Sequence, residues 1–226
     1  LMLLAPGTPM LFQGQEFAAS QPFCYFADHQ PELAKLIFAG RNKELSQFRS
    51  LATPEAQAYL CDPADPQTFE QCKLDFTERA KHKGMYQMHR DLLKLRRVDK
   101  AFSTQRRGGV DGAVLAEEAF VLRFFSGTDE PSLPDDRLLI VNFGRDWVLN
   151  PAPEPLLAPP IGFGWSILWS SEDPRYGGLG TPPLETTEGW LIPGHAAVVL
   201  QPTRGTAIED ETLAAPNANQ SREEYT

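Results

Sequence analysis

The spacing of hydrophobic and polar residues changes along the chain, and each change predicts a different kind of element. Thr8–Gln13 is a short apolar run that ends at Gly14, which is typical of a strand buried on both faces of a parallel sheet. Residues 18–30 form a loop rich in aromatic residues. Pro31 and Glu32 then predict the start of a helix, because proline is favoured at the first helical position and an acid in the first turn.

Residues 82–98 carry the clearest helical pattern. Apolar side chains recur there at steps of three and four, with charged residues between them. The apolar set is Met85, Met88, Leu92 and Leu95. We expect an amphipathic helix that packs on the opening strand, with Arg96 and Arg97 solvated at its carboxyl end. Before it, residues 51–80 contain three prolines, which predicts a loop with short helical pieces.

From about residue 104 the pattern changes to that of short strands. Ala113–Phe125 predicts a hairpin that turns near Glu117 and Glu118. Further apolar runs follow, each bounded by Gly or Pro or by a turn: Leu138–Phe143, Trp165–Trp169 and Ala196–Gln201. Short strands at this spacing predict an antiparallel β-sandwich. The fold class is therefore α/β in the first part of the chain and all-β in the second.

We expect three parts: residues 1–103, the β-sandwich at 104–203, and a tail at 204–226. The tail is acidic and poor in apolar residues, which predicts disorder. One strand and one helix do not cover a sheet on both faces, so residues 1–103 are expected to be the end of a larger unit. The chain also opens on an apolar run at Leu1, which we expect to be the last turn of a core helix.

Composition excludes several classes of function. The 226 residues carry a net charge of −9, which argues against binding of nucleic acid through a general basic field. No apolar run reaches the ~20 residues of a membrane span, and no signal peptide is evident. Cys24, Cys61 and Cys72 lack CxxC spacing and are expected to be reduced, buried or idle thiols of a cytoplasmic protein.

The chemistry-bearing residues give no sign of a metal or a cofactor. His82, His89 and His195 are too scattered for a metal set. No phosphate-binding or dinucleotide-binding glycine pattern and no GxSxG motif is present. We therefore expect neither a metal nor a cofactor.

The opening segment carries a resemblance to a known family. Pro6-Gly7-Thr8-Pro9-Met10-Leu11-Phe12-Gln13-Gly14-Gln15-Glu16-Phe17 resembles the eighth barrel strand of the α-amylase family, glycoside hydrolase family 13. Later residues are similar to the maltooligosyltrehalose trehalohydrolases within that family. These are Phe23 to His29, Leu33 through Gly40-Arg41, Phe69, Leu74-Asp75-Phe76 and the helix Arg90 to Arg97. The likeness covers residues 1–103 well, continues more loosely over the β module and leaves out the tail.

The resemblance implies both a fold and an activity. Residues 1–103 would be strand eight, its loop and helix eight of a (β/α)8 TIM barrel, followed by the family's C-terminal β-sandwich. The implied reaction is the retaining hydrolysis of the α-1,4 bond next to a terminal trehalose unit, which releases trehalose from maltooligosyltrehalose or a related α-glucan. The three catalytic acids of the family lie on strands four, five and seven. They are expected upstream of Leu1, so this chain would hold no catalytic residue and would be inactive alone.

Seven residues near the implied end of strand eight are candidates for sugar binding. They combine planar polar groups with aromatic rings: Gln15, Glu16, Phe23, Tyr25, Phe26, Asp28 and His29. Each has a structural alternative. Gln15 and Glu16 could tie down the loop, the aromatic rings could form a loop core, and Asp28 could cap the helix that begins at Pro31.

Other functions stay open at this stage. The chain could belong to another α-amylase-family enzyme, such as a glycogen branching enzyme. The β module could instead be a non-catalytic carbohydrate-binding module. Its four tryptophans would then form a sugar-stacking surface rather than a sandwich core: Trp147, Trp165, Trp169 and Trp190.

Overall fold

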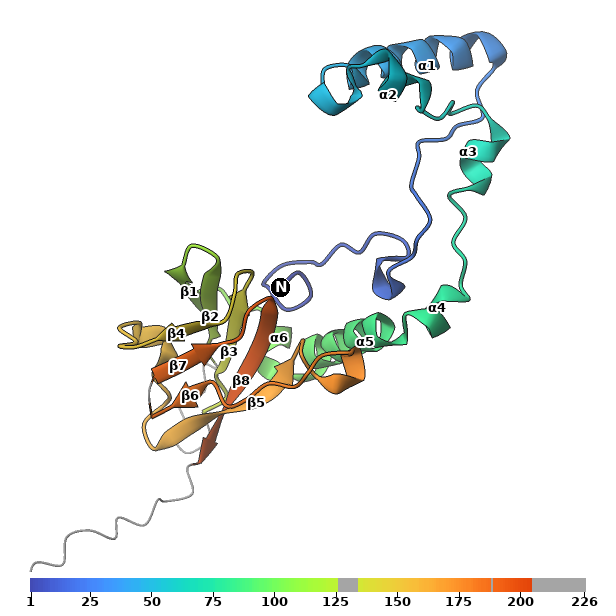
Figure 1. The fold of residues 1–226 in the computed structure, drawn as a ribbon. Helices are drawn as coiled ribbons and strands as arrows, with labels where there is room; N and C mark the ends of the chain where they lie inside the picture. Colours follow the sequence, from blue (N-terminus) through green and yellow to red (C-terminus); the bar gives the residue numbers. More distant parts are fainter. Residues whose placement is uncertain (126–133, 188, 205–226) are drawn as a thin grey trace, which may run out of the picture. The chain divides into compact units, whose positions relative to one another are not determined.

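The computed structural model describes residues 1–125, 134–187 and 189–204, and the chain divides into two compact units (Figure 1). One unit is Pro9–Leu93, and the other combines Leu1–Thr8 with the chain from Lys94 onward. The tail predicted at 204–226 lies, beyond Arg204, outside the described residues.

Helices and loops make up the Pro9–Leu93 unit. In chain order the elements are the 3-10 turn η1 (Gln15–Phe17), α1 (Pro31–Leu45), η2 (Arg49–Leu51), α2 (Pro54–Ala58), α3 (Pro66–Glu70), α4 (Glu78–Lys81) and α5 (Lys83–Val98), which runs on into the other unit. Pro31 occupies the first turn of α1, as predicted, and α5 matches the predicted helix at 82–98. Among the described residues, no helix has the length and hydropathy to cross a bilayer.

The strand predicted over residues 8–13 is absent from the structure. These residues join neither of the two sheets, and Met10 and Phe12 are 86% and 53% exposed. A parallel strand is stabilised by hydrogen bonds to its neighbours and by cover on both faces. No described strand lies beside residues 8–13, so these residues have no neighbouring strand with which to form a sheet. The barrel itself remains a prediction from the resemblance.

The other unit contains two antiparallel sheets, as the strand spacing predicts. The larger has the order β1-β2-β3-β8-β5 and the smaller the order β4-β7-β6. Their bounds are β1 (Val110–Ala116), β2 (Ala119–Phe124), β3 (Arg137–Asn142), β4 (Trp147–Leu149), β5 (Phe163–Ser170), β6 (Glu185–Thr186), β7 (Gly189–Ile192) and β8 (Ala196–Arg204). The hairpin turns at Glu117 and Glu118, where it was predicted. The short strands β4, β6 and β7 were not predicted.

The core of this unit lies between the two sheets. Val121, Ile140 and Val198 contribute from the larger sheet, and Ile192 and Trp190 from the smaller one. Their side chains are at most 6% exposed. Strand β3 is buried along its whole length, because it is the middle strand of its sheet and both of its faces are covered. This explains why its apolar residues form an unbroken run rather than an alternating one.

A short helix and one arginine complete the unit. The ring of Phe102 in α6 (Lys100–Ser103) packs edge-on against Phe124, with 4.8 Å between centroids. The guanidinium of Arg96 donates hydrogen bonds to the carbonyls of Leu3, Ala5 and Gly7. The prediction that both arginines are solvated is therefore wrong for Arg96, which is half-buried and bonded to these carbonyls. Arg97 is exposed, as predicted.

Candidate functional site

The loop that carries the candidate residues begins with a sharp turn at Gly14. Its φ of 81° lies in the left-handed region, and a Cβ placed there would come within 2.6 Å of the Ala19 Cβ and 2.9 Å of Leu74 Cδ2. Glycine alone meets both conditions without strain. The turn leads into η1, which buries the ring of Phe17 completely.

Two contacts anchor this turn to α4 and to the residue that follows it. The Glu78 carboxylate accepts hydrogen bonds from the backbone N–H of Ser20 at 2.9 Å and from its hydroxyl at 2.7 Å. These bonds lower the pKa of Glu78 below its usual value. Nδ1 of His82 lies 2.9 Å from the carbonyl oxygen of Phe17. No motif marks Glu78 in the sequence, and it was not among the predicted site residues.

The two polar candidates in η1 have different surroundings. Gln15 is exposed, and its side-chain oxygen accepts a hydrogen bond from the backbone N–H of Phe12 at 3.1 Å. Glu16 is half-buried. The side chain of Gln15 therefore fixes the backbone at Phe12, just before the turn, and Gln15 itself remains exposed to solvent.

An exposed row of aromatic rings runs through the loop. Phe23 lies edge-on to Phe12, with 4.9 Å between centroids, and contacts Phe26 at 6.4 Å. Phe26 in turn meets Phe69 of α3 at 5.0 Å. Phe23 is 57% exposed and Phe26 is 37% exposed. The aromatic row thus packs against itself while leaving much ring surface accessible.

Tyr25 lines a pocket of about 260 Å³ between the loop and α1. The guanidinium of Arg41 lies over its ring, 4.4 Å from the centroid. Phe23, Cys24 and Cys61 line the same pocket. The pocket combines aromatic faces with a cation and with the side-chain amide of Asn42 in α1, a mixture that suits a neutral polar ligand.

Asp28 and His29 follow the aromatic row. Asp28 is exposed, and the residue at the N-cap of α1 is Gln30. The alternative in which Asp28 caps α1 is therefore wrong, because the helix begins at Pro31 and its N-cap is the preceding residue, Gln30. Nε2 of His29 and Oε1 of Gln21 are buried and lack hydrogen-bond partners within the described chain. Buried polar atoms are nearly always paired, so these two atoms point to a partner.

No group of three or more His, Cys, Asp or Glu side chains in residues 1–125, 134–187 and 189–204 is arranged to hold a metal ion.

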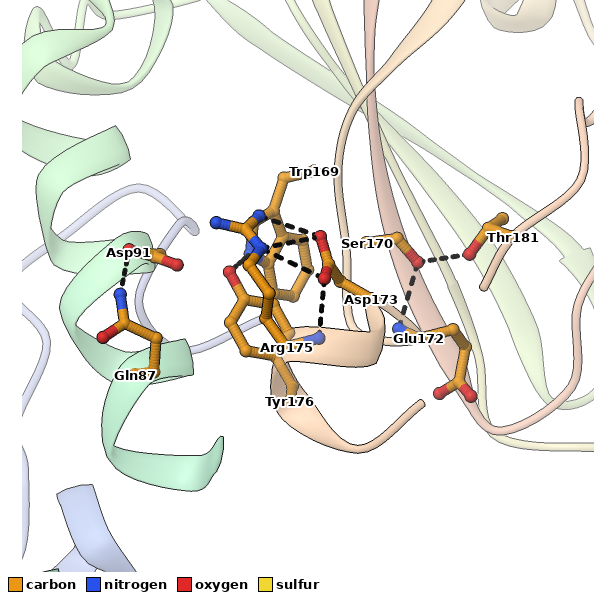
Figure 2. Close-up of polar contacts among 9 residues, drawn as sticks. All are labelled: Gln87, Asp91, Trp169, Ser170, Glu172, Asp173, Arg175, Tyr176 and Thr181. Carbon is orange, nitrogen blue, oxygen red and sulfur yellow. Dashed lines mark hydrogen bonds and ion pairs between the residues drawn. The ribbon is translucent and has the colours of Figure 1, made fainter. Parts of the chain in front are cut away.

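The β unit places its tryptophans in two environments. Trp147, Trp165 and Trp190 belong to or pack against the core between the sheets. Trp169 instead lies beside Tyr176, with its indole N–H 3.1 Å from the phenol oxygen (Figure 2). Their rings are 6.1 Å apart at 37°.

Polar groups surround this second environment. In Figure 2 the guanidinium of Arg175 meets the Asp173 carboxylate side on, with the shortest contact at 2.8 Å. The hydroxyl of Ser170 lies 2.6 Å from that of Thr181. Aromatic rings and planar polar groups thus occur together outside the sandwich core.

Comparison with known proteins finds a family model and several relatives that each match part of this chain. The family model described as a domain of unknown function (DUF3459) matches residues 107–199, which cover most of the two sheets. The chain is 39% identical over 150 residues to a malto-oligosyltrehalose trehalohydrolase of Deinococcus radiodurans. That match covers 64% of this chain and 22% of the relative.

Two further relatives carry the same name. The protein of Mycobacterium tuberculosis is 41% identical over 99 residues, which cover 42% of this chain and 16% of the relative. The protein of Rhizobium sp. (strain M-11) is 36% identical over 131 residues, which cover 56% and 21%. The chain therefore spans about a fifth of the length of the curated relatives it matches.

Proposed function

We propose that this chain, whose sequence resembles malto-oligosyltrehalose trehalohydrolases, is the C-terminal part of a glycoside hydrolase that releases trehalose from maltooligosyltrehalose. The observation that carries the proposal is the identity of 36–41% to relatives of that one name. The match to DUF3459, the C-terminal domain of this family, supports it. The catalytic acids are proposed to lie in the part of the enzyme that precedes Leu1.

Within such an enzyme the Gly14–Gln30 loop would form one wall of the sugar site. Pyranose rings present C–H faces that pack on aromatic planes, and the exposed ring surfaces of Phe23 and Phe26 are available for this contact. Tyr25 would add a third ring, which Arg41 holds in place. A neutral substrate needs no steering by charge, and the acidic composition of the chain is compatible with that.

The two unpaired atoms support a binding role for this loop. Nε2 of His29 and Oε1 of Gln21 are buried without partners in the part of the chain that the structure describes. An unsatisfied buried polar atom costs about 1–3 kcal/mol. Sugar hydroxyls both donate and accept, so a hydroxyl would satisfy either atom once that side chain turns toward the site. We propose that Gln15, Glu16, Asp28 and His29 supply the polar contacts of the wall.

Product analysis of the complete enzyme tests the activity. Trehalose released from maltooligosyltrehalose is the expected product, and new α-1,6 branches on glucan would instead identify a branching enzyme.

In the same assay, replacing Phe23 by Ala should raise the KM for maltooligosyltrehalose about tenfold, because the ring contact with the sugar is lost. Phe48→Ala is the matched control, because that residue is similarly exposed (53% against 57% for Phe23) but lies outside the aromatic row.

The environment of Trp169 favours a second candidate, a carbohydrate-binding surface on the β unit. Trp169 lies outside the sandwich core, beside Tyr176. Binding of maltodextrin to the 226-residue chain that is lost in Trp169→Ala would support it. Trp165 is unsuitable for this test, because its indole N–H is bonded to the carbonyl of Leu157 and its replacement would disturb the fold.

A further inference from the structure

The three cysteines meet in the Pro9–Leu93 unit although they are far apart in sequence. Sγ of Cys24 lies 3.7 Å from Sγ of Cys61. The backbone N–H of Cys24 donates to Sγ of Cys72 at 3.2 Å. Cys61 is exposed, Cys24 is half-buried and Cys72 is buried. An accessible thiol therefore touches a second thiol, with a third beside it.

The hydrogen bonds of Cys72 differ from those of Cys61. Sγ of Cys72 is held by the backbone, since it donates to the carbonyl of Thr68 at 3.1 Å and accepts from Cys24. Sγ of Cys61 faces Cys24 and accepts a hydrogen bond from the side-chain amide of Gln71 at 3.3 Å. A disulfide needs a sulfur separation of about 2.05 Å. The side chains of Cys24 and Cys61 are therefore close enough to bond after a movement of less than about 2 Å.

We propose that Cys24 and Cys61 form a disulfide in the folded chain, a modification site that ties the aromatic loop to the segment Tyr59–Cys61. The oxidant is a small-molecule disulfide such as glutathione disulfide. The Cys61 thiolate attacks one sulfur of the oxidant and expels a glutathione thiolate, which gives a mixed disulfide. The Cys24 thiolate then attacks Sγ of Cys61 and expels the second glutathione. Both cysteine protons end on the released glutathione, so two protein thiols are oxidised and one disulfide is reduced.

The pKa of Cys24 affects the rate of the second step, in which its thiolate is the nucleophile. Burial, helped by the neighbouring thiols of Cys61 and Cys72, raises the pKa of the Cys24 thiol to about 11. The thiolate is the nucleophile, so little reactive Cys24 exists at neutral pH while Cys61 is still a free thiol. Where ring closure limits the rate, the rate should increase as the pH is raised, because Cys24 attacks Sγ of Cys61 as the thiolate. Cys61, the exposed thiol, meets the oxidant first.

The cross-link has a structural consequence. Cys24 and Cys61 both line the pocket of about 260 Å³ that Phe23 and Tyr25 also line. The disulfide would fix two of its walls to each other. An effect on sugar binding would rest on the proposed function, but formation of the bond does not.

Peptide mapping of the 226-residue chain tests the pairing. The folded chain is treated with glutathione disulfide, alkylated, and digested with trypsin and a glutamate-specific protease. Cleavage after Glu70 separates Cys61 from Cys72. The expected product is peptide 17–32 joined to peptide 56–70, which reducing agent separates. Peptide 71–73 joined to either of the others would overturn the proposal.

Two controls show whether the fold selects the pair. In the unfolded chain, loop closure favours Cys61 with Cys72, 11 residues apart, over Cys24 with Cys61, 37 apart, by about sixfold. The same distribution of products from folded and unfolded chain would contradict the proposal. Cys72→Ser should form the Cys24–Cys61 bond within about twofold of the unchanged rate. Loss of the bond in that variant would show that Cys72 is a partner and would also overturn it.

Discussion

At the scale of single residues, the candidate loop is positioned by side chains that no motif marks. Glu78 fixes Ser20 through two hydrogen bonds, and His82 meets the carbonyl of Phe17. Both lie about 60 residues further along the chain. The exposed rings of Phe23 and Phe26 therefore depend on contacts made elsewhere in the Pro9–Leu93 unit.

Acid should loosen this loop through Glu78. Its pKa lies below the usual 4.5, so its contribution to stability is complete above about pH 4.5 and is lost as the pH falls through the lowered pKa. Hydrogen exchange in peptide 17–32, corrected for intrinsic rates, should therefore be less protected at about pH 3.5 than at about pH 6.

Two variants isolate the carboxylate. Glu78→Gln should lower protection at about pH 6 and remove its part of the pH dependence, because the amide does not titrate. Glu70→Gln is the matched control, since Glu70 is half-exposed and its carboxylate forms a surface ion pair with Lys73, three residues further along the chain. Equal pH dependence in the wild type and in Glu78→Gln would contradict this account.

At the scale of elements, local sequence predicts where helices begin and where the hairpin turns. It does not predict the long-range contacts that hold these elements in place. Proline and an acid at the start of α1 act within one turn. The Glu117–Glu118 turn joins two neighbouring strands. Arg96 and Arg97 look alike in the sequence, yet only Arg96 reaches the carbonyls of residues 3–7.

This difference predicts unequal effects of one substitution. Arg96→Met keeps the apolar stem of the side chain and removes the donors to Leu3, Ala5 and Gly7. The free energy of unfolding should fall by about 2–3 kcal/mol, because these bonds involve a charged donor. Arg97→Met should change it by less than about 0.5 kcal/mol. Urea unfolding followed by tryptophan fluorescence measures both, and equal losses would contradict the assigned role.

At the scale of the whole molecule, the stability of the β unit depends on how its sheets pair. Strand β3 lies between β2 and β8, although β8 begins more than 50 residues after β3 ends. The pairing of Ile140 with Val198 brings two core side chains together across this interval. The core is therefore assembled from distant parts of the chain.

Truncation in this core should be far more damaging than truncation at the surface. Ile140 is 1% exposed, so Ile140→Ala should lower the free energy of unfolding by about 2–5 kcal/mol. Val148 of β4 is 57% exposed, so Val148→Ala should change it by about 0.5 kcal/mol or less. Thermal unfolding of the two variants compares them, and similar losses would argue against the core between the sheets.

The sequence by itself determined the local elements and the change from helices to antiparallel strands, because turn chemistry and hydrophobic period act over a few residues. It also carried the likeness to trehalohydrolases, since a motif is read from adjacent positions. It failed at residues 8–13, where an apolar run becomes a strand only beside other strands.

Only the tertiary structure decided which residues meet. It brings Cys24 to Cys61, leaves Nε2 of His29 without a partner in the described chain, and gives Gln30 rather than Asp28 the cap of α1. Contacts between the cysteines depend on how helices and loops fold back on one another. No local sequence pattern predicts these contacts, because the residues that make them are brought together by the packing of the whole unit.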